Sequence, residues 1–441
     1  MNILFISLGC DKNLVDSEVM LGLLDREGYQ IVDDETEADV IVVNTCCFIH
    51  DAKEESIQAI LEAAEYKVTG RLKALIVTGC LAQRYQKEIA EEIPEVDAVL
   101  GTASYDKIAE AVKEALAGHP CMEMEDIDAL PLVDAKRLVT TGGHYAYLKI
   151  AEGCDKHCTY CIIPKIRGNF RSVPMERLVR EAEELAGQGV KELILVAQET
   201  TLYGKDIYGE KSLHRLLREL CTIEGLRWIR ILYCYPEEIY DELIQVIKEE
   251  KKICHYLDLP IQHANDEILR RMGRRTSKQQ LTEVIHKLRE EIPDITLRTT
   301  LITGFPGETD AQHEELMEFI DEMEFERLGV FTYSPEEDTP AAVMPDQIPE
   351  EKKADRQAEL MELQQDIVFE QADAMVGRKV LVMIEGKVAD EDAYVGRTYK
   401  DAPGVDGLIF INTEEELMSG DFAMAEVTGA LEYDLIGELI S

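Results

Sequence analysis

Apolar runs of strand length alternate with helical patterns along most of the chain, and this alternation limits the possible folds more than any other feature. In residues 1–117 the runs NILFISLGC, ADVIVVNTC and KALIVTGC are separated by helical stretches such as DSEVMLGLLDREGY and AKEESIQAILEAAEYK. Strands made almost only of Val, Ile and Leu are buried on both faces, which is typical of a parallel sheet covered by helices. The sequence therefore predicts an N-terminal α/β domain over residues 1–117.

A second series of the same kind begins near residue 144. Its candidate strands are YAYLKIAEG, ELILVAQ, WIRILYCYP, YLDLPIQH, ITLRTTLITG and RLGVFTYS, and helical patterns separate most of them. Six such strands predict a partial TIM-like barrel, which carries functional groups on loops at the C-terminal ends of its strands. We expect this domain over residues 141–372. Residues 118–140 contain Pro120 and Pro131 and show no clear period, so we interpret them as a linker.

Residues 373–441 have a different pattern. KVLVMIEGKV, GLIFINT and DFAMAEVTGALEYDLIGELI are strand-like and are separated by Gly and Asp turns. Short strands of this kind predict a small closed, OB-like β-barrel. The expected fold class is therefore α/β in three parts: a parallel sheet domain, a partial barrel and a small β-barrel.

The N-terminus, MNILFISLGCDKN, lacks a basic region, and no run of about 18 apolar residues occurs in the chain. We therefore expect no signal peptide and no transmembrane helix, and we predict a cytoplasmic location. In that reducing compartment the 11 cysteines should be thiols, so that groups of cysteines indicate metal binding or catalysis rather than disulfides.

The chain is strongly acidic, with 46 Lys and Arg against 88 Asp and Glu and a formal net charge of −42. A protein that binds nucleic acid usually presents a basic surface that displaces counterions from phosphates. An acidic protein instead attracts a basic protein partner. The alternative is that the net charge serves solubility alone.

Three cysteines end successive strands of the predicted N-terminal sheet. Cys10, Cys46 and Cys80 close the runs LGC, NTC and TGC. Because the carboxyl ends of the strands of an open α/β sheet converge on one crevice, we expect these thiols to meet there. The alternative is three buried core cysteines, since free cysteine is among the most buried residue types. Three thiols at successive strand ends favour a metal site.

A second group of cysteines, in GCDKHCTYC, follows the first strand of the predicted barrel. Cys154, Cys158 and Cys161 have the spacing CxxxCxxC, and thiolates favour zinc or iron–sulfur clusters. A structural zinc site needs a fourth ligand, and none follows at zinc-finger spacing. A [4Fe–4S] cluster on three thiolates leaves one iron free for another ligand. The alternative is a zinc knuckle that uses a distant His or Cys.

This motif resembles that of the radical S-adenosylmethionine (SAM) superfamily, CxxxCx(aromatic)C, in which Tyr160 supplies the aromatic residue. The resemblance implies that the free iron chelates the amino and carboxylate groups of SAM. It also implies that one electron from the cluster cleaves the sulfonium and yields a deoxyadenosyl radical. The protein positions and shields this chemistry.

The N-terminal cysteines, the radical SAM motif and the C-terminal barrel together resemble the methylthiotransferase family over essentially the whole chain. The resemblance implies a second [4Fe–4S] cluster on the three N-terminal cysteines and a C-terminal TRAM domain that recognises the substrate. Known members modify an adenosine of tRNA or an aspartate of a small-subunit ribosomal protein. The opening SLGCDKNLVDSE is similar to the ribosomal-protein branch, because the tRNA branch has a Gln-Met-Asn type sequence where this chain has Asp11, Lys12 and Asn13.

The charge of the C-terminal barrel agrees with that branch. Residues 376–441 contain 5 Lys and Arg against 14 Asp and Glu, a net charge of −9. A barrel that binds tRNA should be basic, whereas an acidic barrel suits a basic ribosomal protein. The charge of the barrel is a feature separate from the cysteine motif and the opening tripeptide.

Several polar residues lie at predicted strand ends where the superfamily contacts SAM. By resemblance, Gln198, Thr200 and Gln262 lie near the SAM amino group, and Arg298 and Gly304 lie on the strand that contacts adenine and ribose. Arg298 is a charged residue within a buried strand and needs a partner, such as a SAM carboxylate. The alternative for each polar residue is a local hydrogen bond.

Two arginines follow the second cysteine group, in PKIRGNFRS. Arg167 and Arg171 either stabilise a cluster or another anionic group, or are ordinary surface charges. His157 lies inside the cysteine loop, and we expect it to be exposed rather than a ligand.

The resemblance implies two uses of SAM. One molecule methylates a sulfur on the cluster of the N-terminal cysteines. A second yields the radical that takes a hydrogen from the β-carbon of a substrate aspartate, and the carbon radical then captures the methylthio group. The expected substrate is a basic small-subunit ribosomal protein, the twelfth, and the expected electron donor is a protein such as a flavodoxin. We expect no membrane partner and no tRNA substrate.

Two alternatives remain open. The first is the same chemistry on isopentenyl-adenosine in tRNA, which a basic face would favour. The second is a non-enzymatic iron–sulfur carrier that binds a ribosomal partner, holds clusters and does not cleave SAM.

Overall fold

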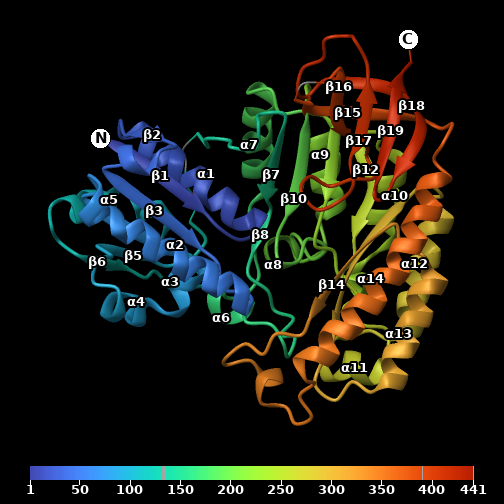
Figure 1. The fold of residues 1–441 in the computed structure, drawn as a ribbon, viewed down its shortest axis with the longest axis horizontal. Helices are drawn as coiled ribbons and strands as arrows, with labels where there is room; N and C mark the ends of the chain where they lie inside the picture. Colours follow the sequence, from blue (N-terminus) through green and yellow to red (C-terminus); the bar gives the residue numbers. More distant parts are fainter. Residues whose placement is uncertain (132, 134–135, 390, 441) are drawn as a thin grey trace.

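The computed structural model describes residues 1–131, 133, 136–389 and 391–440. It contains two six-stranded sheets, a two-stranded sheet and a closed barrel. Figure 1 shows the N-terminal domain in blue beside the central sheet, with the C-terminal barrel in red. The predicted α/β fold with a small β-barrel is confirmed. Among the described residues no helix has the length and hydrophobicity needed to cross a membrane.

The N-terminal sheet is parallel, in the order β2-β1-β3-β4-β5-β6. Its strands are β1 (Asn2–Ser7), β2 (Gln30–Val32), β3 (Val40–Thr45), β4 (Ala74–Gly79), β5 (Ala98–Leu100) and β6 (Cys121–Glu123). The strands β2 and β6 were not predicted from the sequence, because each has three residues and shows no period of its own. The first residues of the stretch interpreted as a linker therefore form β6 and extend the sheet.

Helices cover both faces of this sheet. One face packs against α1 (Asp11–Arg26) and α5 (Ile108–Leu116), which bury side chains such as Met20, Leu24 and Ile108. The other face packs against helices that follow the cysteine-bearing strands. These helices are α2 (His50–Thr69), α3 (Cys80–Arg84) and α4 (Gln86–Glu92). The core on this second face also includes Ile162 and Ile166, which belong to the segment after the second cysteine group, so the domains share a core here.

The central sheet is also parallel and contains all six predicted strands, in the order β14-β13-β12-β11-β10-β7. Its strands are β7 (Tyr145–Lys149), β10 (Glu192–Val196), β11 (Trp228–Ile231), β12 (Ile253–Asp258), β13 (Thr296–Thr303) and β14 (Arg327–Thr332). The order places β7 and β14 at opposite edges, which makes the sheet an open, partial barrel. A short pair, β8 (Ala151–Glu152) and β9 (Arg171–Ser172), flanks the second cysteine group.

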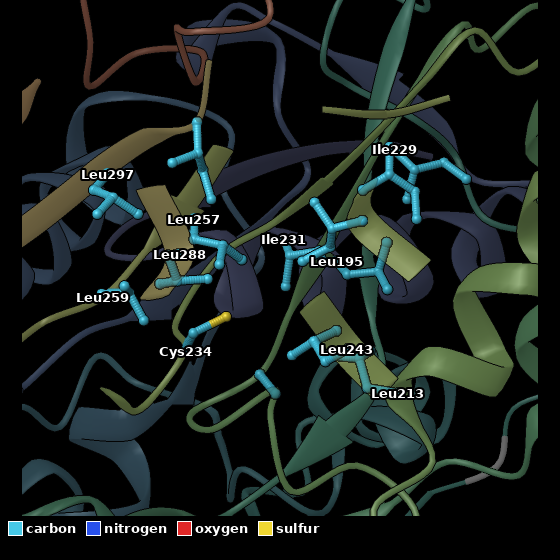
Figure 2. Close-up of a cluster of buried hydrophobic side chains, with 14 of the residues drawn as sticks. Leu195, Leu213, Ile229, Ile231, Cys234, Leu243, Leu257, Leu259, Leu288 and Leu297 are labelled. Atoms are coloured by element: carbon cyan, nitrogen blue, oxygen red, sulfur yellow. The ribbon is translucent and has the colours of Figure 1, made fainter. Parts of the chain in front are cut away.

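The outer face of the central sheet forms the largest core. Figure 2 shows part of it, where strand residues such as Leu195, Ile231 and Leu257 meet Leu243 and Leu288 from the covering helices. The long helices are α7 (Met175–Gly187), α9 (Leu213–Cys221), α10 (Asp241–Glu249), α12 (Lys278–Glu291), α13 (Asp310–Met323) and α14 (Glu350–Asp373). The short helices are α6 (Ile163–Arg167), α8 (Lys205–Tyr208) and α11 (Asp266–Arg271).

The C-terminal barrel closes in the order β15-β16-β17-β19-β18, with β18 paired to β15. Its strands are β15 (Lys379–Lys387), β16 (Ala393–Arg397), β17 (Ile409–Asn412), β18 (Phe422–Leu431) and β19 (Asp434–Leu439). Side chains at alternate positions, such as Val382, Ile384, Ile409 and Ile411, fill the interior. Closure leaves no free strand edge on this small domain.

The barrel packs against the inner face of the central sheet. Tyr147, Trp228 and Tyr256 point to this face and share a core with Met383 and with Leu14 of α1. The Trp228 and Phe422 rings meet edge to face, with their centroids 4.9 Å apart. The barrel and α1 therefore fill this part of the open sheet's inner face.

Buried ion pairs fix the barrel in this place. Glu192 of β10 accepts from Arg230 Nε at 2.7 Å and from Arg397 Nη2 at 2.7 Å, and none of these side chains is more than 1% exposed. Arg397 also contacts Glu385 at 2.6 Å, and Glu385 contacts His144 at 2.7 Å. Burying charges is costly, so such a network requires every member to be paired.

We expect Glu192→Gln to lower the free energy of unfolding by about 3 kcal/mol, because Arg230 and Arg397 would remain buried without a balancing charge. Trp228 is the single tryptophan of the chain and lies at this interface, so its fluorescence during urea denaturation reports the loss of barrel docking. The control is Glu291→Gln, which removes the exposed pair with Lys248 and should change stability by less than about 0.5 kcal/mol. Equal effects of the two substitutions would contradict the prediction.

Candidate active site

The three N-terminal cysteines lie together at the C-terminal edge of the first sheet. Cys10 precedes α1, Cys46 directly follows β3, and Cys80 begins α3 after β4. The backbone at Gly9 has φ +90°, and a Cβ added there would lie 2.7 Å from Cys46 Cβ and 3.0 Å from its Sγ. Only glycine at position 9 lets the loop before Cys10 pass this close to Cys46. The strand order reverses beside β1, which is the switch point where open α/β sheets bind ligands.

Burial makes two of these thiols, Cys46 and Cys80, hard to ionise without a cation. Cys46 and Cys80 are buried and Cys10 is partly exposed. Burial raises the pKa of the Cys46 thiol and raises that of Cys80 further, while the nearby Arg167 guanidinium works in the opposite direction. A metal centre that binds thiolates supplies the missing positive charge.

The second cysteine group forms a loop that backbone contacts fix. Cys154 N donates to Gly168 O at 3.1 Å, and Thr159 N donates to Met272 O at 2.9 Å. Burial raises the pKa of the Cys154 thiol to about 12 and that of Cys161 higher still. His157 is exposed and has φ +52°, as expected for a loop residue that is not a ligand.

Within the described ranges, no three His, Cys, Asp or Glu side chains lie close enough together to hold a single metal ion. A [4Fe–4S] cluster places its thiolates farther apart than an ion does, because each thiolate binds a different iron. Each group offers three buried or partly buried thiols, which matches the three thiolates of such a cluster, whereas a tetrahedral zinc ion needs four ligands.

Two of the expected SAM contacts offer free acceptors. Gln198 Nε2 donates to Glu152 Oε1 at 2.6 Å, which fixes the amide. The Oε1 atoms of Gln198 and Gln262 are buried and have no hydrogen-bond partner among the described residues. Gln262 has φ +71° and bridges to Leu301 of β13. Buried acceptors without partners are costly, so both oxygens suit a ligand that carries donors, such as an ammonium group.

Two other expected SAM contacts, Thr200 and Arg298, bond to groups of the protein itself. Thr200 is fully buried and its hydroxyl donates to Leu232 O at 2.8 Å. Arg298 lies 3.3 Å from both Asp258 and Asp406, so two protein carboxylates supply the partner that we had expected from SAM.

Gly304 has φ +70°, and a Cβ there would lie 2.3 Å from the Lys353 side chain, which indicates close packing of α14. Tyr160, the aromatic residue of the cysteine motif, packs beside Met272, Phe305 and Tyr333. Its ring therefore connects the cysteine loop to the apolar core beneath it.

A buried charge network joins the two cysteine groups. Arg167 of α6 contacts Asp16 of α1 at 2.8 Å and Glu152 at 3.2 Å, and Lys149 contacts the same Glu152 at 2.7 Å. Arg167 also donates to Asn13, and the Asn13 Oδ1 atom lies 3.9 Å from Cys80 Sγ. The Arg167 side chain is only 2% exposed, so the surface-charge interpretation of this residue is wrong.

Arg171 donates to the Arg167 and Asn169 carbonyl oxygens and stabilises the loop.

The sequence did not predict two contacts between the start of α1 and the end of β11 in the central domain. Tyr233 donates its hydroxyl proton to Asp11 at 3.2 Å, and the Lys12 ammonium lies 3.2 Å from the centroid of the Tyr233 ring. Tyr233 has φ +57°, an uncommon conformation for this residue type. The tripeptide that distinguishes the two family branches therefore contacts the central sheet. Its charged residues showed no period that would have indicated this.

Comparisons with known proteins cover all three parts of the chain. Residues 2–101 match a family described as uncharacterized protein family UPF0004, residues 148–320 the radical SAM superfamily, and residues 376–440 the TRAM domain. The chain is 67% identical over 437 residues to the ribosomal protein uS12 methylthiotransferase RimO of Lachnoclostridium phytofermentans, covering 99% of both proteins. It is 49% identical to the protein of the same name from Clostridioides difficile, covering 98% of both.

The chain belongs to the RimO methylthiotransferase family. The predicted family and enzyme class are therefore confirmed. As a radical SAM enzyme it uses SAM and a [4Fe–4S] cluster. Among solved structures, the radical SAM methyltransferase TsrM from Kitasatospora setae shares the fold with a TM-score of 0.56 at 14% identity, over 78% of this chain and 75% of that one.

Glu199 adds a titratable group beside the second cysteine group. It is fully buried, contacts Thr201 and lies 3.8 Å from Lys156. Burial raises the pKa of Glu199 from 4.5 to about 7. The folded protein thus holds this proton more tightly than the unfolded chain does. The resulting stability is fully present below pH 4.5 and is lost as the pH rises through about 7.

We expect the stability of the cluster-free protein to fall, relative to Glu199→Gln, by about 3 kcal/mol across this pH window. Urea denaturation of both proteins at a series of pH values measures the difference. Glu291→Gln, which changes an exposed carboxylate, should differ from the parent by a nearly constant amount. If the free energies of unfolding of Glu199→Gln and the parent also differ by a constant amount across this pH range, Glu199 is ionised in the folded protein and the prediction is wrong.

Proposed function

We propose that the protein replaces one hydrogen on the β-carbon of an aspartate in ribosomal protein uS12 with a methylthio group, and that it uses two [4Fe–4S] clusters. The observation that carries the proposal is the pair of cysteine groups at strand ends, joined by one buried charge network around Arg167. The full-length relatives named for this activity support it. The reaction then takes place in the cytoplasm, with the ribosomal proteins.

In this proposal Cys154, Cys158 and Cys161 hold the cluster of the radical SAM domain, and the three N-terminal cysteines hold the second cluster. When bound, the first supplies the electron for SAM cleavage and the second supplies a site for the sulfur that is transferred. The C–H bond at a β-carbon is not acidic enough for acid–base chemistry alone. A radical source and a separate sulfur site in one chain meet that requirement.

The protein's own residues bind and orient the reactants. Gln198, fixed by Glu152, and Gln262 present buried amide oxygens that can accept from the N–H groups of the SAM amino group. Arg167 balances the negative charge of the N-terminal thiolates. The Thr200 hydroxyl and the Nε and Nη1 atoms of Arg298 bond within the protein, so these groups also fix the strand ends beside the expected SAM site.

The acidic barrel favours a basic protein as the substrate. Residues 376–441 carry a net charge of −9. A phosphate backbone would be repelled there, whereas a basic ribosomal protein would be attracted. The reaction also needs an electron donor, such as a flavodoxin, that supplies the electron for SAM cleavage.

We expect the wild-type protein to bind about eight iron atoms per chain after anaerobic reconstitution. Replacing the three N-terminal cysteines by Ala should leave about four, and so should replacing Cys154, Cys158 and Cys161. Only the second variant should lose SAM cleavage. Iron analysis and the yield of 5′-deoxyadenosine provide the two measurements. If the first variant keeps all of the iron, the N-terminal cysteines are core residues and the two-cluster proposal is wrong.

The substrate is tested by offering uS12 and unmodified tRNA in parallel to the reconstituted protein with SAM, a sulfide source and reductant. We expect mass spectrometry to detect a methylthio group on uS12 and none on tRNA, since an acidic barrel favours the basic protein. Asp→Asn variants of uS12, made one at a time, identify the target. Modified tRNA would contradict the charge argument. Bound clusters without SAM cleavage would favour the iron–sulfur carrier.

A further inference from the structure

The segment between β14 and α14, residues 333–347, lies across the junction of the N-terminal and radical SAM domains, and we call it the strap. In Figure 1 it is the orange loop at the bottom, between β14 and α14. Within the radical SAM domain the strap contacts the cysteine loop directly. Ala341 N donates to Thr159 O at 2.9 Å, and Lys165 Nζ donates to Asp338 O at 2.8 Å.

The strap contacts the N-terminal domain through Glu336. This carboxylate is 2% exposed and lies 3.0 Å from Lys53 Nζ and 3.1 Å from Arg84 Nη1. Arg84 also donates to Glu337 O at 2.7 Å, and Tyr85 donates to the Glu337 carboxylate at 2.9 Å. The strap is therefore bonded to both domains at once.

The partners of Glu336 belong to the elements that carry the N-terminal cysteines. Arg84 is the last residue of α3, which begins at Cys80. Lys53 lies in the first turn of α2, which follows the loop after Cys46. The strap's partner in the other domain, Thr159, lies between Cys158 and Cys161. A few residues on either side of Glu336 thus connect both cysteine groups.

We propose that Glu336 is a positioning residue that sets the placement of the N-terminal cysteines relative to the radical SAM cysteines during methylthio transfer. A buried carboxylate between two cations is a poor source of stability, because desolvation offsets most of the attraction. It does fix geometry, since a displaced partner leaves a buried charge unpaired. The inference rests on the proposed function, in which both cysteine groups hold clusters.

The two parts of the reaction depend differently on this placement. SAM cleavage needs only the radical SAM cysteines. Methylthio transfer needs both cysteine groups to be correctly positioned relative to the substrate. A small misplacement of reacting groups costs a large factor in rate. Loss of the Glu336 contact should therefore uncouple transfer from cleavage.

The test compares Glu336→Gln with the wild-type protein in one assay that measures both 5′-deoxyadenosine and methylthiolated uS12. We expect 5′-deoxyadenosine to stay within about twofold of wild type and the ratio of methylthiolated product to 5′-deoxyadenosine to fall about tenfold or more. Arg84→Gln should do the same, and the double variant should be no worse than either single variant. Glu351→Gln, at the exposed start of α14, is the matched control and should keep the wild-type ratio.

A second measurement does not depend on turnover. Electron paramagnetic resonance of the reduced protein measures the magnetic coupling between the two clusters. We expect this coupling to become weaker, or to take a wider range of values, in Glu336→Gln and to stay unchanged in Glu351→Gln. If Glu336→Gln does not fold, Lys53→Gln replaces it, because it removes one of the two ion pairs of Glu336 and leaves the carboxylate paired with Arg84.

The outcomes separate the two ideas. If the wild-type protein cleaves SAM but does not modify uS12, the proposed function is wrong, and the magnetic interaction still decides whether Glu336 positions the clusters. If the wild-type protein modifies uS12 and Glu336→Gln keeps both the wild-type ratio and the magnetic interaction, the inference is overturned. A parallel loss of cleavage and transfer would also overturn it, since it would indicate a general folding role.

Discussion

Buried charges at the junction of the first two domains determine how the rest of the molecule is arranged. Arg167, Lys149, Asp16 and Glu152 come from both sides of the junction and are each nearly inaccessible to water. None could be buried alone, because an unpaired charge in the interior costs several kcal/mol. Each also lies close in sequence to one of the cysteine groups. The same contacts that neutralise the charges therefore place the C-terminal edges of the two sheets together.

The C-terminal barrel complements this arrangement from the other side. It shares a core with α1 and the inner face of the central sheet, and the ion pairs around Glu192 hold it there. The inner face thus has an apolar part that the barrel covers and a polar part near the strand ends. Arg298 marks the boundary, because it contacts Asp258 of the sheet and Asp406 of the barrel. The C-terminal barrel is therefore packed rigidly against the inner face of the central sheet, and it also carries an excess of acidic residues.

The parts that sequence analysis predicted are those with a local signal. The six central strands are long apolar runs, and the cysteines follow strands whose parallel arrangement brings their ends together. The strands β2 and β6 are too short to show a period. The partners of Arg298 lie 40 and 108 residues away in sequence, so no spacing could have assigned them. Glu336 looks like a surface residue in the acidic stretch SPEED, and only the tertiary structure buries it.

The chain has a large excess of acidic residues, and against this background the buried arginines beside the cysteine groups indicate where negative charge is balanced. A chain with a net charge of −42 should disfavour further buried negative charge, and iron–sulfur clusters on thiolates carry it. Each cysteine group nevertheless has one buried arginine beside it. Arg167 lies near Cys80, and Arg274 stacks 4.3 Å from the centroid of the Tyr235 ring, whose hydroxyl lies 3.8 Å from Cys158 Sγ. Buried arginines thus lie beside the thiols although the chain as a whole is acidic. The net negative charge favours a basic protein partner, while the buried arginines favour negative charge on the thiols beside them.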